Sequence, residues 1–389
     1  MERLICAKEL TIVIPCLNEE RTIGFCIARA RSAFRDLNIE GEVLVVDNGS
    51  TDRSIEAASS AGARVVQQEV KGYGSALLKG FQEAEGEFII MGDADGTYDF
   101  SVIEGFVTLL RQGTDFVMGS RFRGTILPGA MPFHHRYLGT PVLTRVINLF
   151  FGAKISDVNC GMRGFTKKAI MKLDLRSPGM EFASEMIIKA MSVGLTVKEI
   201  PINLYPPPVE RTPHLHSFRD GWRHLRFMLL FCPKYLFFYP GLLIFAMGMI
   251  FTLLLFFRST FFNIQFGLST AVLADSLLLI GAQVSLFGVY SLIIQSSQGL
   301  LKGDKVGVFL QDSFTLERGL CFGGTLFLAG TFICMAVFYQ FLTSAYNLDY
   351  VNIPLTRGAI GSIFLALLGL QIIFSSFYIS MFNTTKALR

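Results

Sequence analysis

The stretch FIIMGDADGTYDF, residues 88–100, decides how the N-terminal half of this chain folds. Four apolar residues, Phe88–Met91, predict a short buried strand, which runs into Gly92 and two aspartates, Asp93 and Asp95. Side chains at i and i+2 point to the same side of an extended chain, so both carboxylates can face one point beyond the strand. Open α/β sheets bind their ligands at that end of the strands. Two carboxylates there suit Mg²⁺ or Mn²⁺ that substrate phosphates also hold, although a lone D-x-D can equally be a solvated acidic turn.

The sequence on either side of this stretch alternates short apolar runs with helical patterns. Strands are predicted at Leu10–Ile14, Glu42–Val46, Ala63–Gln67, Phe88–Met91 and Asp115–Met118, with helices at 18–34 and 75–85 among them. Such alternation predicts a mainly parallel α/β sheet with right-handed crossovers. Polar residues follow the strands and would lie at the carboxyl edge of the sheet: Asn18, Glu19, Asp47, Asp93, Asp95 and Arg121. No G-x-G-x-x-G follows the first strand, so an ordinary dinucleotide-binding fold is disfavoured.

The pattern is less regular beyond residue 121. We expect an amphipathic helix at Arg136–Phe151, a polar loop at 156–165 that enters a further element, a helix at Phe182–Val193 and a strand at Thr196–Leu204. Three consecutive prolines, residues 206–208, then break the pattern. We therefore treat residues 1–212 as one domain.

The composition changes in the C-terminal part of the chain. Of the 389 residues, 51% are hydrophobic and only 17% are charged, and residues 1–230 carry charge throughout. Four long charge-free runs follow, and each exceeds the roughly 20 residues needed to span a hydrocarbon core. They predict a membrane domain at 235–389 with four transmembrane helices, at about 235–257, 276–298, 320–345 and 359–383.

Basic residues between the predicted spans indicate their orientation. Arg258 and Arg357 are single arginines on one side, whereas the other side has Lys302, Lys305, Arg318, Lys386 and Arg389. The positive-inside rule then predicts a multi-pass protein whose N-terminal domain and C-terminus are cytoplasmic. A secretory signal is absent from MERLICAKELTIVIP, and the seven cysteines form no C-x-x-C pair, which fits a reducing compartment. No basic tract interleaved with aromatics and no zinc-ligand spacing occurs, so we expect no nucleic-acid partner.

The segment SFRDGWRHLRFMLLFCPK, residues 217–234, joins the two parts of the chain. It combines basic residues with an apolar face: Arg219, Arg223, His224 and Arg226 with Phe218, Trp222, Leu225, Phe227 and Leu229. A basic helix with such a face is typical of the membrane interface, and the alternative is a surface helix packed on the domain. Its place next to the first span favours the interface, so we assign residues 213–234 to a basic amphipathic interface helix.

Five motifs in chain order resemble those of the family 2 glycosyltransferases, which have the Rossmann-like GT-A fold. They are PCLNE at 15–19, VVDNGSTD at 45–52, KGYGSALLKGF at 71–81, DAD at 93–95 and GSRF at 119–122. The resemblance covers about residues 9–230. Together with a D-x-x-x-G-x-R loop at 157–163 and the trailing spans, these motifs are most similar to those of polyprenyl- or dolichyl-phosphate hexose synthases.

The resemblance implies roles for the matched residues. A nucleoside pocket would be lined by Pro15, Leu17, Glu19 and Asp47, although Asp47 can instead cap the next helix. The metal would be held by Asp93 and Asp95, and the donor would be engaged by Asp93, Ala94, Asp95 and Arg136. Arg121 would stabilise the phosphates, unless it pairs with a carboxylate. Candidates for the acceptor phosphate are Arg211, Arg219 and Arg223, and further candidates for the site are Glu185, Asp157 and Arg163.

Two positions depart from the family pattern. Many relatives have a glutamine two residues after the second aspartate, as a further metal ligand, where this chain has Thr97. Many relatives also have two acidic residues where this chain has Asp47-Asn48, which bears on recognition of the base.

The implied reaction transfers a hexose from a UDP- or GDP-linked sugar to a polyprenyl phosphate, with Mg²⁺ or Mn²⁺. A hydroxyl acceptor would need a general base, whereas a phosphate monoester is largely dianionic at pH 7 and can attack the anomeric carbon directly. Attack from the side opposite the leaving diphosphate predicts inversion. A homo-oligomer is left open.

Two other functions stay open at this point. Processive polysaccharide synthases of the same superfamily carry a Q-x-x-R-W motif, but the only tryptophan, Trp222, sits in D-G-W-R. The acids nearest to the position of their catalytic base are Glu181 and Glu185. The chain could instead be a membrane scaffold or lipid flippase that only binds a nucleotide sugar. The presence of both the D-x-D and the G-S-R motif argues against a domain that binds a nucleotide sugar without catalysing its transfer.

Overall fold

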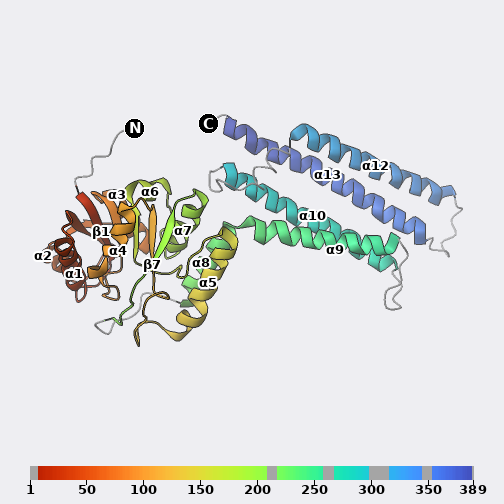
Figure 1. The fold of residues 1–389 in the computed structure, drawn as a ribbon. Coiled ribbons are helices and arrows are strands. Elements are labelled where there is room, and N and C mark those ends of the chain that lie inside the picture. Colours follow the sequence, from red (N-terminus) through yellow and green to blue (C-terminus); the bar gives the residue numbers. More distant parts are fainter. Residues whose placement is uncertain (1–7, 208–216, 257–266, 298–314, 344–352, 388–389) are drawn as a thin grey trace. The chain divides into compact units, whose positions relative to one another are not determined.

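A computed structural model describes five stretches of the chain (Figure 1): residues 8–207, 217–256, 267–297, 315–343 and 353–387. By packing, the chain divides into two compact units, Met1–Phe231 and Cys232–Arg389. The first unit contains the sheet and its helices, and the second contains the long apolar helices. The basic helix that precedes the first span therefore groups with the sheet.

The first unit is built around a seven-stranded sheet in the order β3-β2-β1-β4-β6-β5-β7. The strands are β1 (Lys8–Cys16), β2 (Gly41–Asp47), β3 (Arg64–Gln67), β4 (Gly86–Met91), β5 (Phe116–Ser120), β6 (Arg163–Thr166) and β7 (Val197–Pro201). Strands β3, β2, β1 and β4 pair in parallel, as do β5 and β7, whereas β6 is antiparallel to both β4 and β5. The mainly parallel sheet is confirmed, and the end of the predicted polar loop at 156–165 is part of strand β6.

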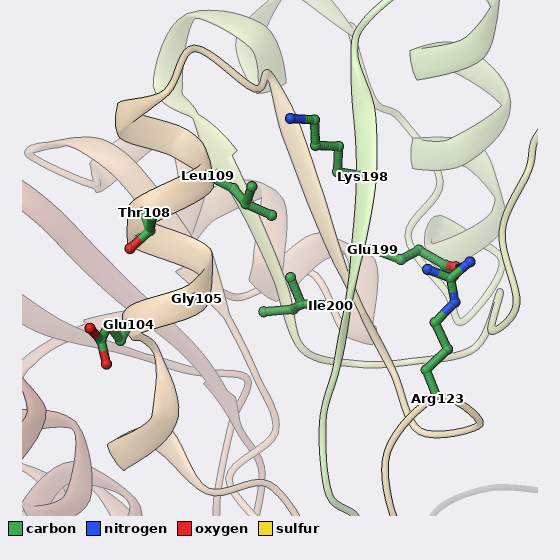
Figure 2. Close-up of a pocket in the computed structure, with 8 residues that line it drawn as sticks. All are labelled: Glu104, Gly105, Thr108, Leu109, Arg123, Lys198, Glu199 and Ile200. Atoms are coloured by element: carbon green, nitrogen blue, oxygen red, sulfur yellow. Dashed lines mark ion pairs between the residues drawn. The ribbon is translucent and has the colours of Figure 1, made fainter.

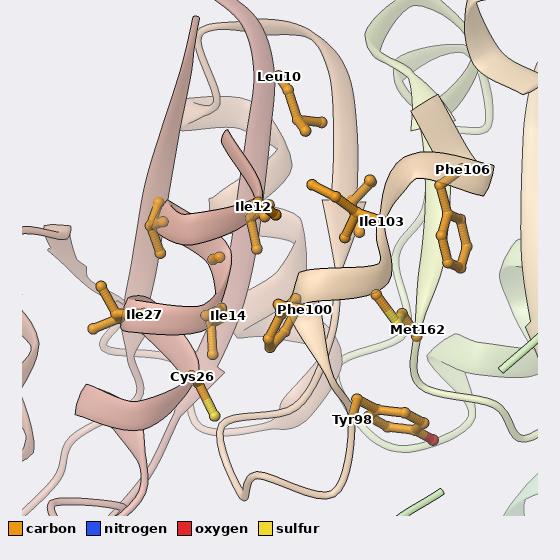
Figure 3. Packing of buried hydrophobic residues seen from close by; sticks show 14 of the residues in the cluster. Leu10, Ile12, Ile14, Cys26, Ile27, Tyr98, Phe100, Ile103, Phe106 and Met162 are labelled. Atoms are coloured by element: carbon orange, nitrogen blue, oxygen red, sulfur yellow. The ribbon is translucent and has the colours of Figure 1, made fainter. Parts of the chain in front are cut away.

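Helices cover both faces of this sheet. They are α1 (Ile23–Asp36), α2 (Ser54–Ser60), α3 (Tyr73–Glu83), η1 (Phe100–Val102), α4 (Glu104–Arg111), η2 (His135–Gly139), α5 (Thr140–Phe151), α6 (Lys167–Lys172), α7 (Phe182–Ser192) and α8 (Ser217–Leu230). Alternation along each strand divides the core into two layers. Ile12 and Ile14 of β1 join the layer with Ile27 of α1 and Phe100 of η1 (Figure 3), whereas Val13 joins the layer with α3, α5, α6 and α7.

Strand register brings three strand ends to one edge of the sheet. Cys16, the last residue of β1, lies opposite Asp47, the last residue of β2. On the other side of β1, Val13 lies opposite Met91, the last residue of β4. The motif loops that follow β1, β2 and β4 therefore start next to one another, as expected for the ligand-binding edge of an α/β sheet.

The described residues of the second unit form the turn η3 (Lys234–Phe238) and four long helices. The helices are α9 (Tyr239–Phe256), α10 (Leu268–Ser297), α12 (Leu316–Thr343) and α13 (Ile353–Ala387). Each is long and apolar enough to cross a membrane: the candidate spans are Lys234–Leu255, Leu268–Gln295, Leu316–Thr343 and Thr356–Met381. The four predicted spans are confirmed as helices. The second begins at Leu268 rather than at residue 276, because the helix continues through Asp275, where the charge-free run stops.

Glycines let the membrane helices approach closely in two pairs. A Cβ on Gly281 of α10 would lie 2.4 Å from the backbone nitrogen of Phe245 in α9. A Cβ on Gly369 of α13 would lie equally close, at 2.4 Å, to the backbone nitrogen of Phe327 in α12. Small residues at such contacts are typical of helix packing in membranes. Hydrogen bonds of Gln371 with Gln283 and of Tyr290 with Ser375 join α10 to α13.

Candidate functional site

The loops after β1 and β2 hold each other in place. Asn18, in the left-handed conformation at φ 58°, accepts a 2.8 Å hydrogen bond from the amide of Thr51. The amide of Asn18 donates to Ser50 Oγ at 2.9 Å, and the amide of Glu19 donates to Ser54 Oγ at 2.8 Å. Asparagine tolerates the left-handed region better than most residues. The PCLNE and VVDNGSTD motifs thus form one connected rim.

Asn48 fixes the loop between β3 and α3. Its Nδ2 donates to the carbonyls of Gln68 and Val70 at 2.9 and 2.8 Å, and its Oδ1 accepts from the amide of Gly72 at 2.7 Å. Lys71 Nζ donates to the carbonyl of Asn48 at 2.9 Å. A carboxylate at this position would place an acceptor against two carbonyls. This explains why the chain has an amide here rather than a second acid.

Different partners hold the two aspartates after β4. Asp93 Oδ1 accepts a 3.0 Å hydrogen bond from the Tyr73 hydroxyl, whose pKa is raised by burial and by the Asp93 charge, so the phenol stays a donor. Asp95 Oδ1 accepts from the amide and the hydroxyl of Thr97, at 3.0 and 2.6 Å. A Cβ on Gly161 would lie 2.5 Å from Asp93 Oδ2, so this close approach requires glycine.

A pocket of about 350 Å³ opens at this edge of the sheet. Its lining comes from all of these loops and from α8: Pro15, Cys16, Leu17, Glu19, Asn48, Lys71, Gly72, Tyr73, Ala76, Asp93, Ala94, Asp95, Gly179, Met180, Arg219 and Arg223. The sequence predicted Pro15, Leu17, Glu19, both aspartates with Ala94 between them, and the two arginines. The structure brings these residues together within the first unit.

The donor set suits a hard divalent cation. Asp93 and Asp95 both line the pocket, and Mg²⁺ is commonly held by one or two carboxylates together with waters and substrate phosphates. Within the described stretches, no three His, Cys, Asp or Glu residues gather into a metal cluster. The pocket therefore fits a metal that shares its coordination with a phosphate ligand, rather than an all-protein metal site.

A second pocket of about 460 Å³ adjoins the first. The two share four residues: Lys71, Gly72, Gly179 and Arg223. The second pocket adds Pro178, Glu181, Arg226, Phe227 and Leu230. Cations and apolar side chains from α8 thus lie together beside the aspartate pocket.

Several predicted residues do not line either pocket: Asp47, Arg121, Arg136, Asp157, Arg163 and Glu185. Asp47 closes its own loop, because its Oδ2 accepts from the amide of Gly49 at 2.9 Å, and the neighbouring Asn48 lines the pocket in its place. Arg136 lies on η2, with its guanidinium 5.5 Å from the ring centre of Tyr137. Arg211 lies outside the described residues.

Arg121 forms a buried, two-pronged ion pair with Asp157. Its Nε and Nη2 donate to the two carboxylate oxygens at 2.6 and 2.8 Å, and its backbone amide donates to the same carboxylate at 3.1 Å. The Asp157 side chain has no exposed area, and that of Arg121 is 11% exposed. Of the two alternatives for Arg121, the structure shows pairing with a carboxylate.

Arg163 anchors the same D-x-x-x-G-x-R loop from inside the core. It is fully buried and donates to the carbonyls of Cys160, Ala183 and Val158 at 2.9, 2.7 and 2.7 Å. Of the three motif positions, Asp157 therefore holds Arg121, Gly161 approaches Asp93 closely, and Arg163 fixes the loop.

Glu185 holds the turn that lies against the start of α3. Its carboxylate accepts from the amides of Arg176 and Ser177, at 3.0 and 2.8 Å, and pairs with Lys189 at 2.7 Å. The next residue, Pro178, accepts from the amide of Gly74 at 2.9 Å. These contacts favour a structural role for Glu185.

Comparisons with known proteins agree with these motifs. A model of glycosyl transferase family 2 matches residues 11–174, and one of the family 2 C-terminal transmembrane region matches residues 289–383. The low-salt glycan biosynthesis hexosyltransferase Agl6 of Haloferax volcanii is 39% identical over 374 residues, which are 95% of this chain and 88% of that protein. The chain belongs to glycosyltransferase family 2.

Two further similarities are less extensive. The dolichyl-phosphate hexose transferase of Haloferax volcanii is 31% identical over 196 residues, which cover 50% of this chain and 82% of that protein. A crystal structure of glucosyl-3-phosphoglycerate synthase from Mycobacterium tuberculosis with Mn²⁺, UDP and glucosyl-3-phosphoglycerate has a TM-score of 0.46 and 19% identity, over 59% of this chain and 81% of that chain. The protein is a glycosyltransferase, and its described residues include four candidate membrane helices.

The structure adds pocket residues of this glycosyltransferase that the sequence did not single out. Lys71 and Tyr73 stand in the KGYGSALLKGF motif, so the motif itself was the available signal. Met180 reaches the pocket from the turn before α7, and nothing in the sequence pattern marks it.

A larger cavity of about 730 Å³ lies away from the motifs (Figure 2). Glu104, Gly105, Thr108 and Leu109 of α4 line it, together with Arg123 and with Lys198, Glu199 and Ile200 of β7. Arg123 and Glu199 point toward each other in Figure 2 and form an ion pair at 3.2 Å. None of the motif residues that line the aspartate pocket reaches this cavity, so we do not assign it to the glycosyl transfer.

Proposed function

We propose that this glycosyltransferase transfers a hexose from a UDP- or GDP-sugar to a polyprenyl phosphate at the cytoplasmic face of the membrane, with inversion. The observation that carries the proposal is the shared pocket lining of Asp93 and Asp95 with Arg219 and Arg223. These arginines belong to α8, the last helix before the first span. The pocket thus joins residues suited to a nucleotide sugar with residues close in sequence to the membrane.

The donor would occupy the aspartate pocket. Pro15, Leu17 and Glu19 would border the nucleoside, and Asp93 and Asp95 would hold Mg²⁺ or Mn²⁺ against the diphosphate. When bound, the metal supplies counter-charge to the leaving diphosphate. Lys71 and the arginines of α8 add positive charge on the same pocket lining, and the Tyr73 hydroxyl keeps the Asp93 carboxylate in place.

The acceptor would occupy the adjoining pocket. Arg223, Arg226 and Lys71 provide cations for a phosphate, and Phe227 and Leu230 provide apolar contacts for the start of a prenyl chain. The dianionic phosphate needs no deprotonation before it attacks the anomeric carbon. The work of these residues is to bring two anions together in the correct orientation, which lowers the barrier without acid–base chemistry.

One observation supports a second candidate, transfer to a sugar hydroxyl. Glu181 lines the adjoining pocket, and its Oε2 atom is buried without a hydrogen-bond partner among the described residues. A carboxylate in that position could serve as the general base that a hydroxyl acceptor requires.

A donor and acceptor screen separates the two candidates. Detergent-solubilised full-length protein is given UDP- and GDP-hexoses, Mg²⁺ or Mn²⁺, and either polyprenyl phosphate or sugar acceptors, beside a Glu181→Gln variant. We expect an acid-labile lipid-linked hexose from polyprenyl phosphate, formed by both proteins. Turnover with sugar acceptors alone, abolished in Glu181→Gln, would overturn the proposal in favour of the second candidate.

A further inference from the structure

Glu181 has a carboxylate that the fold itself does not use. Its Oε2 atom is buried and has no hydrogen-bond partner among the described residues. Glu181 stands directly before α7, where an acid commonly caps the first turn, but its side chain makes no cap hydrogen bond. The structural role that this position offers to an acid is therefore not taken up.

The next acid along the chain shows the contrast. Glu185, one helical turn further on, accepts from the amides of Arg176 and Ser177 and pairs with Lys189. Its oxygens are thus satisfied by the protein, whereas Oε2 of Glu181 is not. Buried polar groups in native proteins are rarely left unpaired, so an exception calls for a partner that binds there.

The position of Glu181 indicates where such a partner would lie. The aspartate pocket and the adjoining pocket share Lys71, Gly72, Gly179 and Arg223, so these residues mark the junction between the two. A Cβ on Gly179 would lie 2.5 Å from Glu181 Oε2 and 2.9 Å from Oε1. The carboxylate therefore lies directly against the junction, and the absence of a side chain at residue 179 permits this approach.

The proposed reaction determines which part of the substrates occupies the junction. The donor diphosphate would be held by Asp93 and Asp95 in one pocket, and the acceptor phosphate would lie in the other. The new bond joins an acceptor oxygen to the anomeric carbon, and reacting atoms must approach to about 3–3.5 Å before they react. The hexose must therefore lie where the two pockets meet, beside Glu181.

The chemistry of a carboxylate selects the group that it binds. An ionised carboxylate only accepts hydrogen bonds, so its partner must be a donor. The diphosphate and the dianionic acceptor phosphate are acceptors of the same sign of charge, and a prenyl chain is apolar. The nucleoside would lie at Pro15 and Leu17, which the adjoining pocket does not share. The hydroxyl groups of the hexose are the donors that remain.

We propose that Glu181 binds one hydroxyl of the donor hexose and thereby selects a sugar in which that hydroxyl is free. This inference rests on the proposed function, because that reaction places the hexose at the junction. A site built to bind a hydroxyl rejects an analogue without it, since the buried polar atom is then left unpaired. Glu181 is in this view a specificity-determining residue for the donor, and deoxy sugars are excluded as substrates.

Binding of the donor in the absence of any acceptor tests the proposal. Detergent-solubilised full-length protein with Mn²⁺ is titrated calorimetrically with UDP, GDP, UDP-glucose and GDP-mannose, and with the 2-, 3-, 4- and 6-deoxy analogues of whichever sugar binds. Wild type is compared with Glu181→Ala and Glu181→Gln. The matched control is Glu69→Ala, which removes an exposed glutamate that lines neither pocket.

We expect Glu181→Ala to weaken binding of the nucleotide sugar by about 10-fold or more, as for a lost hydrogen bond to a charged group, and to leave the free nucleotide unaffected. One deoxy analogue should bind wild type more weakly by a similar factor, but should bind Glu181→Ala as well as the parent sugar does. Glu181→Gln, whose amide oxygen still accepts, should lose less, and Glu69→Ala should match wild type.

Two results would overturn the proposal. Equal weakening of nucleotide and nucleotide sugar in Glu181→Ala would show a structural role, because only a contact with the hexose separates the two. Deoxy analogues that lose the same factor in wild type and in Glu181→Ala at every position would show that Glu181 binds no sugar hydroxyl. A hexose-specific loss in a protein that cannot use polyprenyl phosphate would support this inference while refuting the proposed acceptor. Absence of binding to both nucleotide sugars would refute this inference together with the proposed donor.

Discussion

At the scale of single residues, the two aspartates after β4 are restrained unequally. Asp93 is held by the Tyr73 hydroxyl and lies against Gly161, whereas Asp95 receives two hydrogen bonds from Thr97. Thr97 stands where many relatives have a metal-binding glutamine, and here its hydroxyl is engaged with the Asp95 carboxylate at 2.6 Å. Thr97 therefore orients a proposed metal ligand rather than replacing the glutamine.

Replacement of Asp95 by alanine should remove most turnover, because the leaving diphosphate would lose counter-charge. One electrostatic group at such a site is worth about 10²–10³-fold in kcat. The matched variant Thr97→Val removes only the hydroxyl bond to Asp95 and should cost less. The turnover of both variants is measured as the transfer of radiolabelled sugar. Full activity of Asp95→Ala in excess EDTA would contradict the assignment.

The pair of Arg121 and Asp157 should matter for stability. Breaking a buried ion pair from one side costs about 3–5 kcal/mol. The Asp157→Asn variant should therefore unfold at a much lower denaturant concentration than wild type. Arg53→Gln breaks a pair whose side chains are 82% and 66% exposed, and should change the stability little, because solvent screens such pairs. Trp222 emission during denaturation reports on the first unit. An Asp157→Asn protein as stable as wild type but inactive would instead favour the catalytic role predicted for Arg121.

The sequence predicted which residues line the aspartate pocket better than it predicted the partners of individual charged residues. Motif order brought Pro15, Glu19 and both aspartates to one edge, because strand ends in a parallel sheet meet there. Arg121 was different, since its partner Asp157 is 36 residues away and only the fold joins them. Local pattern carries no information on such a distant pairing.

At the scale of elements, the start of α3 depends on the turn before α7. A Cβ on Gly74 would lie 2.2 Å from the carbonyl of Ser177, and Glu185 holds that turn through two backbone amides. The turn also supplies Gly179 and Met180 to the aspartate pocket. Glu185 is thus linked to the pocket through backbone geometry rather than through contact with a substrate.

Glu185→Gln should lower the unfolding midpoint, because the buried Lys189 loses its charged partner. Below the unfolding transition, the Michaelis constant for the lipid acceptor should stay close to wild type. Glu56→Gln, on the exposed surface of α2, is the control for substitution alone. An unchanged unfolding midpoint together with a raised Michaelis constant for the lipid acceptor would show that Glu185 is an acceptor-site residue.

Arg223 on α8 should affect the lipid acceptor more than the nucleotide sugar. Arginine binds phosphate through several donors, and Arg223 is the arginine that lines both pockets. Anchoring of α8 to anionic lipid is the alternative, at about 1 kcal/mol per charge. The variant Arg223→Ala is compared with Arg145→Ala on α5, which lines neither pocket, in neutral and anionic micelles. Equal losses in both variants that anionic lipid restores would eliminate the acceptor role.

Elements with a strong period were predicted well, whereas strand β6 and the start of the second span were not. The alternating strands and the apolar spans are visible because many residues repeat one pattern. Strand β6 has only four residues and follows a polar loop, so periodicity had nothing to detect. The second span was placed too late because Asp275 interrupts an otherwise apolar helix.

At the scale of the whole molecule, the two family matches leave residues 175–288 uncovered. This interval supplies Gly179, Met180, Arg219 and Arg223 to the aspartate pocket. It also contains α8, on which the proposed acceptor pocket depends. The part of the chain outside both family models is therefore where we expect the preference for a particular acceptor to be determined.

Orientation in the membrane is the last property that follows from the chain as a whole. The four candidate spans among the described residues would return the C-terminus to the side of the sheet domain, and the lysines and arginines of 298–318 and 386–389 outnumber Arg258 and Arg357 on the other side. The positive-inside rule predicts that this side is cytoplasmic, where nucleotide sugars are available. A green fluorescent protein fused after Arg389 should fluoresce, and a phosphatase inserted among residues 257–266 should be active, because this segment is predicted to lie outside the cytoplasm. Replacing Lys302 and Lys305 by glutamine should weaken this preference, whereas replacing Arg258 should not. A phosphatase fused after Arg389 that is active outside the cytoplasm would refute the orientation, and with it the cytoplasmic donor in the proposed reaction.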